Sequence, residues 1–488
     1  MSTASLNILM VASEAAPFAK TGGLGDVLGS LPAALGDLGH RIVLVLPWYR
    51  SVQAITGRLR PSRRKVVVPF AGQMKQVGYR SLEQNGVRFL FLDVPEYFDR
   101  SSLYGERGDD YPDNALRFGL LSRAALELAR HIEFVPDVIH AHDWQAGLIP
   151  VYLRQQLWAD PFFVNSTTLF TIHNLGYHGD FPAETLRQLG LDSTLNRLDG
   201  LEFHGRISLL KGGVRFADRV STVSPSYCRE IQTPDFGMGL DGLLRARSNR
   251  LHGILNGIDP KLWDPATDPA LAASYSAESA AGKKACKRAL QRDLGLPMDA
   301  ETPLLAMITR LDPQKGINLV LEAFDRIMQR GLQLVLLGSG RPDYEQRLSA
   351  AASFFPDQAR ILLRFDDRLS RQIYAASDLF LMPSRYEPCG LGQLIALRYG
   401  SIPVVHATGG LADTICDPQQ DEARANGFSF HTLSSREMLA TLDRALRAYR
   451  DKPDWQSLVG AAMGQDFSWS KAADDYVDLY RTCRGETP

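Results

Sequence analysis

The sequence has few cysteines and no excess of charge of either sign. Its 488 residues include only five cysteines, no two of which form a Cys-x-x-Cys pair: Cys228, Cys286, Cys389, Cys416 and Cys483. A disulfide framework is therefore not expected, and a reducing compartment fits better. The 54 basic and 55 acidic residues leave a formal net charge of −1. Nothing in this balance favours nucleic acid or an anionic membrane as a partner.

Long apolar runs are also missing. The apolar segment at residues 6–12 is too short to cross a membrane, and no basic stretch precedes it. We therefore predict no membrane partner and a cytoplasmic location, in a bacterial cytosol or, for a mature plant protein, a plastid. Hydrophobic content of 45% and charged content of 22% are typical of a folded protein, and the length predicts two domains or more.

Apolar runs of strand length alternate with helical patterns along the chain. Strands at residues 6–12 and 41–47 flank a helical pattern at 27–38, which predicts a βαβ unit. Further strands are predicted at 88–92, 138–141, 169–172 and 219–223. A second series comprises a strand at 304–309, a helix at 317–328 and strands at 332–338, 379–383 and 403–405. The fold class is therefore α/β, with parallel sheets and helices on both faces.

The two series suggest two domains. We predict an N-terminal domain at residues 1–255, a C-terminal domain at 256–470 with a hinge around 256–259, and a helix within 471–488 that could pack back on the first domain. The intervening segment 261–299 holds no strong strand. Ligands of doubly wound sheets bind beyond the carboxyl ends of the strands, so the segments that follow the strands are the candidates for function.

A glycine-rich segment, Lys20 to Asp26, follows the first strand and leads into a helix. Glycines allow a ligand close to the backbone, and a helix N-terminus attracts phosphate. The segment is neither a P-loop nor G-x-G-x-x-G, and a flexible turn is equally compatible with it. Residues 408–413 repeat the pattern Thr-Gly-Gly-Leu-x-Asp, which indicates either a second phosphate-facing loop or a coincidence of glycine-rich turns.

Histidines follow two other strands. His140, His142 and Asp143 at first suggest a metal site, but no third ligand can be identified and we predict no metal. A strand end that displays one polar group is the simpler interpretation. His173 ends the next strand, and from its chemistry alone it is either a core histidine or a catalytic one.

Charged residues follow two strands of the second series. Arg310 and Lys315 bracket a turn, and two cations at one place suit a diphosphate, although a solvated charged turn is the alternative. Glu387, followed by Cys389, Gly390 and Leu391 at a helix start, suits a hydroxyl-rich, anionic ligand.

Taken together, these motifs resemble those of the bacterial glycogen synthases and plant starch synthases, the ADP-glucose branch of the retaining glycosyltransferases. The resemblance spans nearly the whole chain. It rests on the joint order of Lys20–Asp26, His140–Trp144, Thr171–Asn174, Leu255–Asp259, Arg310 with Lys315, Arg385–Leu391 and Thr408–Asp413. Each motif is weak alone, whereas the series in this order is specific.

The resemblance implies the GT-B architecture, in which two Rossmann-like, doubly wound domains face each other across a cleft. It implies transfer of glucose from ADP-glucose to the non-reducing 4-hydroxyl of an α-1,4-glucan with retention of configuration. The implied partners are thus a nucleotide-sugar donor and an α-glucan acceptor, with no cofactor beyond the donor substrate. Alternatives are a UDP-sugar-dependent GT-B transferase and a catalytically silent glucan-binding relative.

Roles carried over from the family fall on matching residues. Arg310 and Lys315 are expected to hold the diphosphate, His173 to lie beside the glucosyl group and Glu387 to stabilise the sugar. The implied substrate-binding residues are Lys20, Gly22, Gly23, Asp26, Asp143, Asn256, Phe365, Cys389, Gly390, Leu391, Thr408, Gly409 and Gly410. Two positions depart from many members, because Gly392 stands where a threonine is common and Phe365 where a tyrosine is common.

Overall fold

The computed structural model describes residues 4–57, 59–106, 109–279 and 281–485. Contacts between Cα atoms divide the chain into two compact units. Residues 1–256 form the first unit together with residues 469–488, and residues 257–468 form the second. We describe each unit by itself. Both are built on a sheet whose strands run mainly parallel, which confirms the predicted α/β class.

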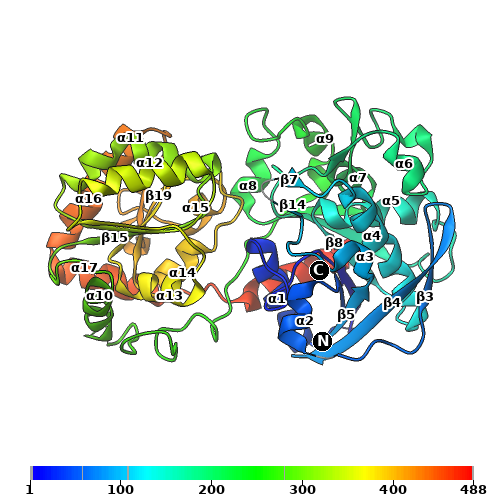
Figure 1. Cartoon of the computed structure of the whole chain (residues 1–488), viewed down its shortest axis with the longest axis horizontal. Helices are drawn as coiled ribbons and strands as arrows, with labels where there is room; N and C mark the ends of the chain where they lie inside the picture. Colours follow the sequence, from blue (N-terminus) through cyan, green and yellow to red (C-terminus); the bar gives the residue numbers. More distant parts are fainter. Residues whose placement is uncertain (1–3, 58, 107–108, 280, 486–488) are drawn as a thin grey trace. The chain divides into compact units, whose positions relative to one another are not determined.

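The first unit is built on a nine-stranded sheet with the order β14-β13-β9-β8-β1-β2-β5-β4-β3 (Figure 1). The parallel strands are β1 (Asn7–Val11), β2 (Arg41–Pro47), β5 (Val87–Asp93), β8 (Val138–His142), β9 (Thr167–Ile172), β13 (Arg219–Thr222) and β14 (Leu251–Gly253). Every strand predicted in this half is present.

One edge of this sheet corrects the prediction of an entirely parallel arrangement. β4 (Gln73–Gln84) pairs antiparallel with β5, and β3 (Val66–Phe70) pairs antiparallel with β4. Apolar runs do not reveal β4, because it is largely polar and lies towards the edge, where most of its side chains are exposed or half-buried. A small sheet of β10 (Asp180–Phe181), β12 (Arg206–Ser208) and β11 (Glu202–Phe203) also went unpredicted, since its strands have only two or three residues.

Helices cover the faces of the first sheet. They include α1 (Gly23–Asp37), α4 (Asn114–His131), α5 (Leu148–Gln155), α7 (Leu209–Phe216), α8 (Pro225–Glu230) and α18 (Trp469–Cys483). The C-terminal helix α18 packs against α1 and β9, and in Figure 1 it lies in red beside the dark blue α1. Its Tyr480 is fully buried, and the Tyr480 hydroxyl lies 2.8 Å from Nδ1 of His140 on β8. The core of the first unit therefore includes the last helix of the chain.

The second unit has a six-stranded parallel sheet with the order β17-β16-β15-β18-β19-β20. The strands are β15 (Leu304–Ile308), β16 (Gln333–Leu337), β17 (Ala359–Leu362), β18 (Leu379–Met382), β19 (Ile402–His406) and β20 (Phe428–Phe430). Around them lie α10 (Ala281–Asp293), α11 (Ile317–Met328), α12 (Pro342–Ser353), α13 (Asp367–Ala376), α14 (Gly392–Arg398), α15 (Gly409–Thr414), α16 (Ser435–Arg450) and α17 (Lys452–Met463), and Figure 1 shows helices on both faces. The predicted helix 317–328 is confirmed residue for residue as α11, whose apolar side chains face a continuous core. The short strands β17 and β20 were not predicted.

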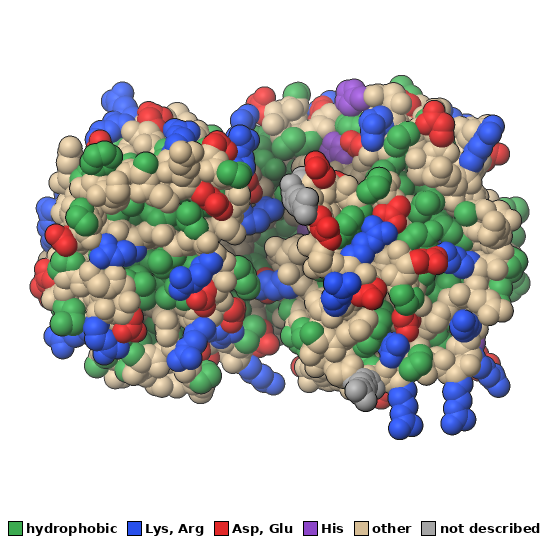
Figure 2. All heavy atoms as spheres, viewed as in Figure 1, with side chains coloured by type: hydrophobic (Ala, Val, Ile, Leu, Met, Phe, Trp, Pro, Cys, Tyr) green, Lys and Arg blue, Asp and Glu red, His purple; other side chains and the backbone are tan. Residues whose placement is uncertain are grey.

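The surface agrees with the balanced composition. On the face shown in Figure 2, acidic and basic side chains are interspersed over each unit. All five cysteines are free thiols. None of the described helices combines the length and the apolar character that a membrane crossing requires.

Candidate functional site

Three neighbouring strands of the first unit bring the predicted residues of this half to one edge of the sheet. β9, β8 and β1 are adjacent and parallel, so their carboxyl ends lie side by side. His173 follows β9, Asp143 follows β8, and the segment Lys20–Asp26 comes after β1 and enters α1. This edge is where doubly wound sheets bind their ligands.

Glu14 organises the glycine-rich segment. Its buried carboxylate accepts hydrogen bonds from the Thr21 backbone N–H and the Thr21 hydroxyl, both at 2.6 Å, and from the Gly22 N–H at 3.3 Å. The Tyr104 hydroxyl donates a fourth bond at 2.5 Å. Sequence reasoning missed Glu14, and the available signal was an acidic side chain within the otherwise small and apolar residues directly after β1.

The glycines of this segment face open space. α1 begins at Gly23, so half of the motif is already the first turn of a helix. A methyl group added at Gly22 or Gly23 meets no atom of the described residues within 4 Å. Lys20 forms an ion pair of 2.7 Å with Asp26, and both side chains remain partly exposed. A ligand could therefore approach the backbone N–H groups of this helix start closely.

The histidines form a buried row. Nδ1 of His142 lies 3.0 Å from Nε2 of His173, and the rings of His140 and His142 are 3.9 Å apart between centroids. Burial lowers the pKa of all three histidines, that of His173 to about 3. His173 is thus buried and hydrogen-bonded, as a core histidine would be, and it also lies at a strand end, as a catalytic histidine would. Its position excludes neither interpretation.

Asp143 has a strained backbone. Its φ of 55° and ψ of −178° place it in a region that residues other than glycine rarely adopt. The Asp143 N–H donates to the Thr171 carbonyl at 2.9 Å, and the side chain accepts from the His173 N–H at 2.7 Å. Burial raises the pKa of Asp143 to about 7, although the backbone N–H groups of His173 and Asn174 oppose that shift. Strain and a perturbed carboxyl group at one strand end are typical of functional sites.

The described part of the chain holds no group of three or more His, Cys, Asp or Glu side chains that could bind a metal ion. His140 instead makes hydrogen bonds with Tyr480 and Thr171, at 2.8 and 2.6 Å.

The second unit gathers its predicted residues at the carboxyl ends of β15, β18 and β19, which are adjacent and parallel. Nζ of Lys315 lies 2.8 and 2.7 Å from the two carboxylate oxygens of Glu387, and the Ser384 hydroxyl donates to the same carboxylate at 2.9 Å. The Glu387 side chain is only 7% exposed, whereas that of Arg310 is 50% exposed and lies 3.7 Å from Asp312. An ion pair with a buried carboxylate and a half-exposed guanidinium group therefore lie together at these strand ends.

The second Thr-Gly-Gly segment packs against the segment that carries Glu387. The Gly410 N–H donates to the Glu387 carbonyl at 3.0 Å. A methyl group at Gly409 would lie 2.0 Å from that carbonyl oxygen, and one at Gly410 would lie 2.0 Å from the Cys389 carbonyl oxygen. These two glycines thus allow two backbone segments to approach each other. One segment contains Thr408, and the other contains Cys389 and Leu391.

The remaining predicted positions differ in exposure. Phe365, which comes soon after β17, is 83% exposed. Asn256 is buried, and its side-chain oxygen has no hydrogen-bond partner among the described residues. Gly390 has a φ of 73°. A methyl group at Gly392 would lie 3.3 Å from the Phe380 ring and 3.4 Å from the Tyr374 hydroxyl, so these aromatic side chains leave little room for the threonine common in the family.

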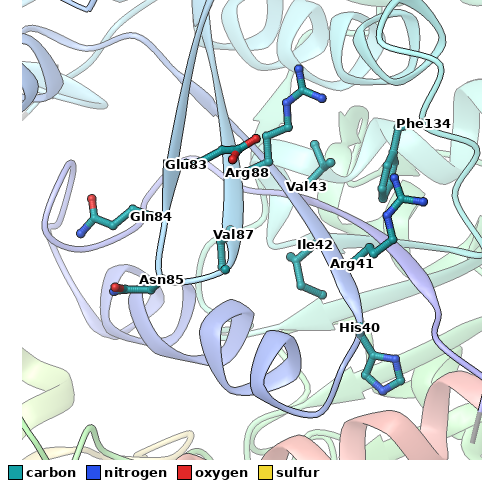
Figure 3. A pocket seen from close by; sticks show the side chains of 11 residues that line it. His40, Arg41, Ile42, Val43, Glu83, Gln84, Asn85, Val87, Arg88 and Phe134 are labelled. Carbon is teal, nitrogen blue, oxygen red and sulfur yellow. The ribbon is translucent and has the colours of Figure 1, made fainter.

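A separate hollow of about 450 Å³ lies at the opposite edge of the first sheet (Figure 3). It is lined by residues at the amino ends of β2 and β5 and by the turn between β4 and β5, among them Arg41, Arg88 and Phe134. None of the predicted site residues lines this hollow.

Comparisons with known proteins agree with the fold of each unit. The family of starch synthase catalytic domains matches residues 7–246, and the family of group 1 glycosyl transferases matches residues 294–456. A glycogen synthase from Syntrophotalea carbinolica is 52% identical over 98% of this chain and 98% of its own. The catalytic domain of starch synthase IV from Arabidopsis thaliana, bound to ADP and acarbose, superposes with a TM-score of 0.92 at 38% identity, covering 99% of this chain and 100% of that one.

A more distant structure supports the fold alone. Sucrose-phosphate synthase from Thermosynechococcus elongatus superposes with a TM-score of 0.61 at 19% identity, over 97% of this chain and 98% of that one. Two α/β units matched in this way define a glycosyltransferase of the GT-B class, as predicted. The chain belongs to the family of glycogen and starch synthases.

Proposed function

We propose that the protein is a glycogen synthase that transfers glucose from ADP-glucose to the non-reducing 4-hydroxyl of an α-1,4-glucan, with retention of configuration. The observation that carries the proposal is the ion pair between the half-buried Lys315 and the buried Glu387 at the carboxyl end of the second sheet, in a chain 52% identical to a glycogen synthase. A buried charge pair costs desolvation energy that packing alone would not require, which is the pattern expected of a functional pair.

Arg310 and Lys315 act on the diphosphate in this proposal. The half-exposed Arg310 guanidinium group can form two parallel hydrogen bonds to phosphate oxygens. Lys315 is held in place by Glu387, so its charge is already oriented when the leaving nucleotide becomes more negative. Two fixed cations can offset this charge, and we therefore propose that the reaction uses neither a metal ion nor an organic cofactor.

The first unit offers polar groups that suit a sugar. His173 is uncharged near neutral pH, and Asp143 is poised near its pKa of about 7. The backbone N–H of Gly23 lies at a helix start, which suits phosphate, and Gly22 beside it lets a ligand come close. That the residues of both units act on one donor and one acceptor stays a prediction from the family resemblance. We also propose a cytosolic location, which cell fractionation would test.

We propose that the configuration is retained through attack of the acceptor from the side on which the nucleotide leaves; a double displacement is the alternative. The departing phosphate can take the acceptor proton, so the protein needs no separate base. Glu387 lies beside Lys315 and can offset positive charge that develops on the glucosyl ring.

The deciding experiment measures incorporation of labelled glucose into glycogen from ADP-glucose and from UDP-glucose. We expect incorporation from ADP-glucose, new linkages of the α configuration, and almost complete loss in Glu387→Gln. Incorporation from UDP-glucose alone would identify a different GT-B transferase. Binding to glycogen without incorporation from either donor would identify a catalytically silent relative.

A further inference from the structure

The buried histidine row of the first unit contains a side chain whose role the proposed reaction leaves open. His142 is the last residue of β8 and is fully buried. Its Nδ1 lies 3.0 Å from Nε2 of His173, so it contacts the predicted catalytic histidine directly from the neighbouring strand. From the sequence, His142 was considered only as a metal ligand, and no metal was predicted.

The bond between these two rings requires one proton. Both imidazoles are neutral at physiological pH, because burial lowers the pKa of each. In a neutral imidazole one nitrogen carries hydrogen and the other carries a lone pair. Either His142 donates from Nδ1, or His173 donates from Nε2. In the first case Nδ1 of His173 carries hydrogen and is a donor; in the second it carries a lone pair and is an acceptor.

The far side of the His142 ring decides between the two arrangements. Nε2 of His142 is buried and has no hydrogen-bond partner among the described residues. If this nitrogen carried hydrogen, a donor would be left unpaired in the interior, and unpaired buried N–H groups are rarer than unpaired acceptors. The proton of His142 therefore belongs on Nδ1, from which it is donated to Nε2 of His173.

The third histidine, His140, does not influence which nitrogen of His142 carries hydrogen. Both of its ring nitrogens are already engaged, Nδ1 with Tyr480 and Nε2 with Thr171. Its ring packs against that of His142, with centroids 3.9 Å apart and the planes tilted by 36°, and thus holds the His142 ring in place without exchanging a proton with it. Tyr480 of the C-terminal helix α18 contacts the row through its hydrogen bond with His140.

We propose that His142 is a positioning residue that holds His173 as its Nδ1–H tautomer, so that His173 presents a hydrogen-bond donor to a hydroxyl of the glucosyl group. The contact with the sugar rests on the proposed function, whereas the tautomer does not. A lone pair at the same position could not donate to the sugar, and transfer would lose a contact that orients the reacting group.

The direct test is the tautomer itself. In the full-length protein with ¹⁵N-labelled histidine, the His173 signals are identified by their absence in His173→Gln. We expect a protonated Nδ1 and an unprotonated Nε2 in the substrate-free protein. A protonated Nε2 on His173 would overturn the proposal, whatever the activity of the enzyme.

Variants separate this role from a structural one. His142→Leu cannot donate, and we expect kcat to fall by roughly ten- to a hundredfold while KM changes less than about threefold. His142→Asn carries an amide close to the former Nδ1 and should recover most of kcat together with the Nδ1–H signal of His173. Equal activity of the two variants would contradict the proposal.

His140→Asn is the matched control. It should lower thermal stability, because the Thr171 hydroxyl loses its partner at the former Nε2 position, but leave the His173 tautomer unchanged. A reversed tautomer in this variant would show that His140 rather than His142 sets the proton. If the wild-type protein transfers no glucose, the proposed function fails, while the spectrum still decides the tautomer.

Discussion

The chain contains the pattern Thr-Gly-Gly-Leu-x-Asp twice, and the two copies are used differently. In the first unit, Gly22 and Gly23 border open space at the start of α1. In the second unit, Gly409 and Gly410 are buried against the carbonyl groups of Glu387 and Cys389. The first copy is available to a ligand, whereas the second allows two backbone segments to pack. The same six-residue pattern therefore does not imply the same role.

The charged side chains beside the two copies differ in the same way. Lys20 and Asp26 form an ion pair with 35% and 26% of their side chains exposed. Lys315 and Glu387 form one with only 17% and 7% exposed. Exposed pairs contribute about 0 to 1 kcal/mol, but removal of one partner from a buried pair costs several. The second unit thus holds its charges in a more costly and more oriented arrangement.

Substitution of the two lysines should give the largest contrast. Lys315→Met leaves Glu387 buried without its cation, so we expect a loss of about 3–5 kcal/mol in unfolding free energy and of about a thousandfold in kcat/KM. Lys20→Met should cost less than about 1 kcal/mol in stability and act mainly on donor KM. Urea unfolding and initial rates measure both. Equal stability losses in the two variants would remove the distinction between the pairs.

The carboxyl groups of Asp143 and Glu387 offer a second contrast, because Asp143 has backbone N–H partners where Glu387 has a lysine. The Asp143 pKa is about 7 in the folded protein against an ordinary value of 3.8, so the folded chain binds one more proton between these pH values. Its contribution to stability therefore decreases as pH rises from about 4 to 7.

Asp143→Asn removes this titration. We expect the variant to be more stable than the wild type at pH 8, by up to about 4 kcal/mol, and to show little difference near pH 4. Activity should decrease, because the ionisable group is lost. Urea unfolding at both pH values measures the effect, with exposed Asp235→Asn as control. A stability difference that does not change with pH would contradict the raised pKa.

The glycines themselves provide the smallest but most direct comparison. Gly410→Ala places a methyl group 2.0 Å from the Cys389 carbonyl oxygen, and we expect a loss of roughly 3 kcal/mol as the backbone shifts. Gly23→Ala, at the equivalent position of the motif, should change stability by less than about 1 kcal/mol. It should instead raise donor KM, because the methyl group covers the helix start. Tolerance of alanine at Gly410 would show that the second copy is not packed as described.

Much of the fold follows from local patterns. The strands β1, β2, β15, β16 and β18 are almost entirely apolar, because strands buried on both faces favour apolar residues throughout. The placement of functional residues directly after such strands could be predicted for the same reason. β4 was missed because its sequence is largely polar, and the edge strand β3 was missed although its residues are apolar.

The sequence by itself determined the α/β class, the family and the strand ends where chemistry was expected, because apolar periodicity and motif order are local properties of the chain. Only the tertiary structure decided that Glu14 holds the first Thr-Gly-Gly segment, that the second segment is packed, and that His142 contacts His173. Each of these depends on which distant backbone or side-chain atoms come within about 3 Å, and no spacing along the chain encodes that distance.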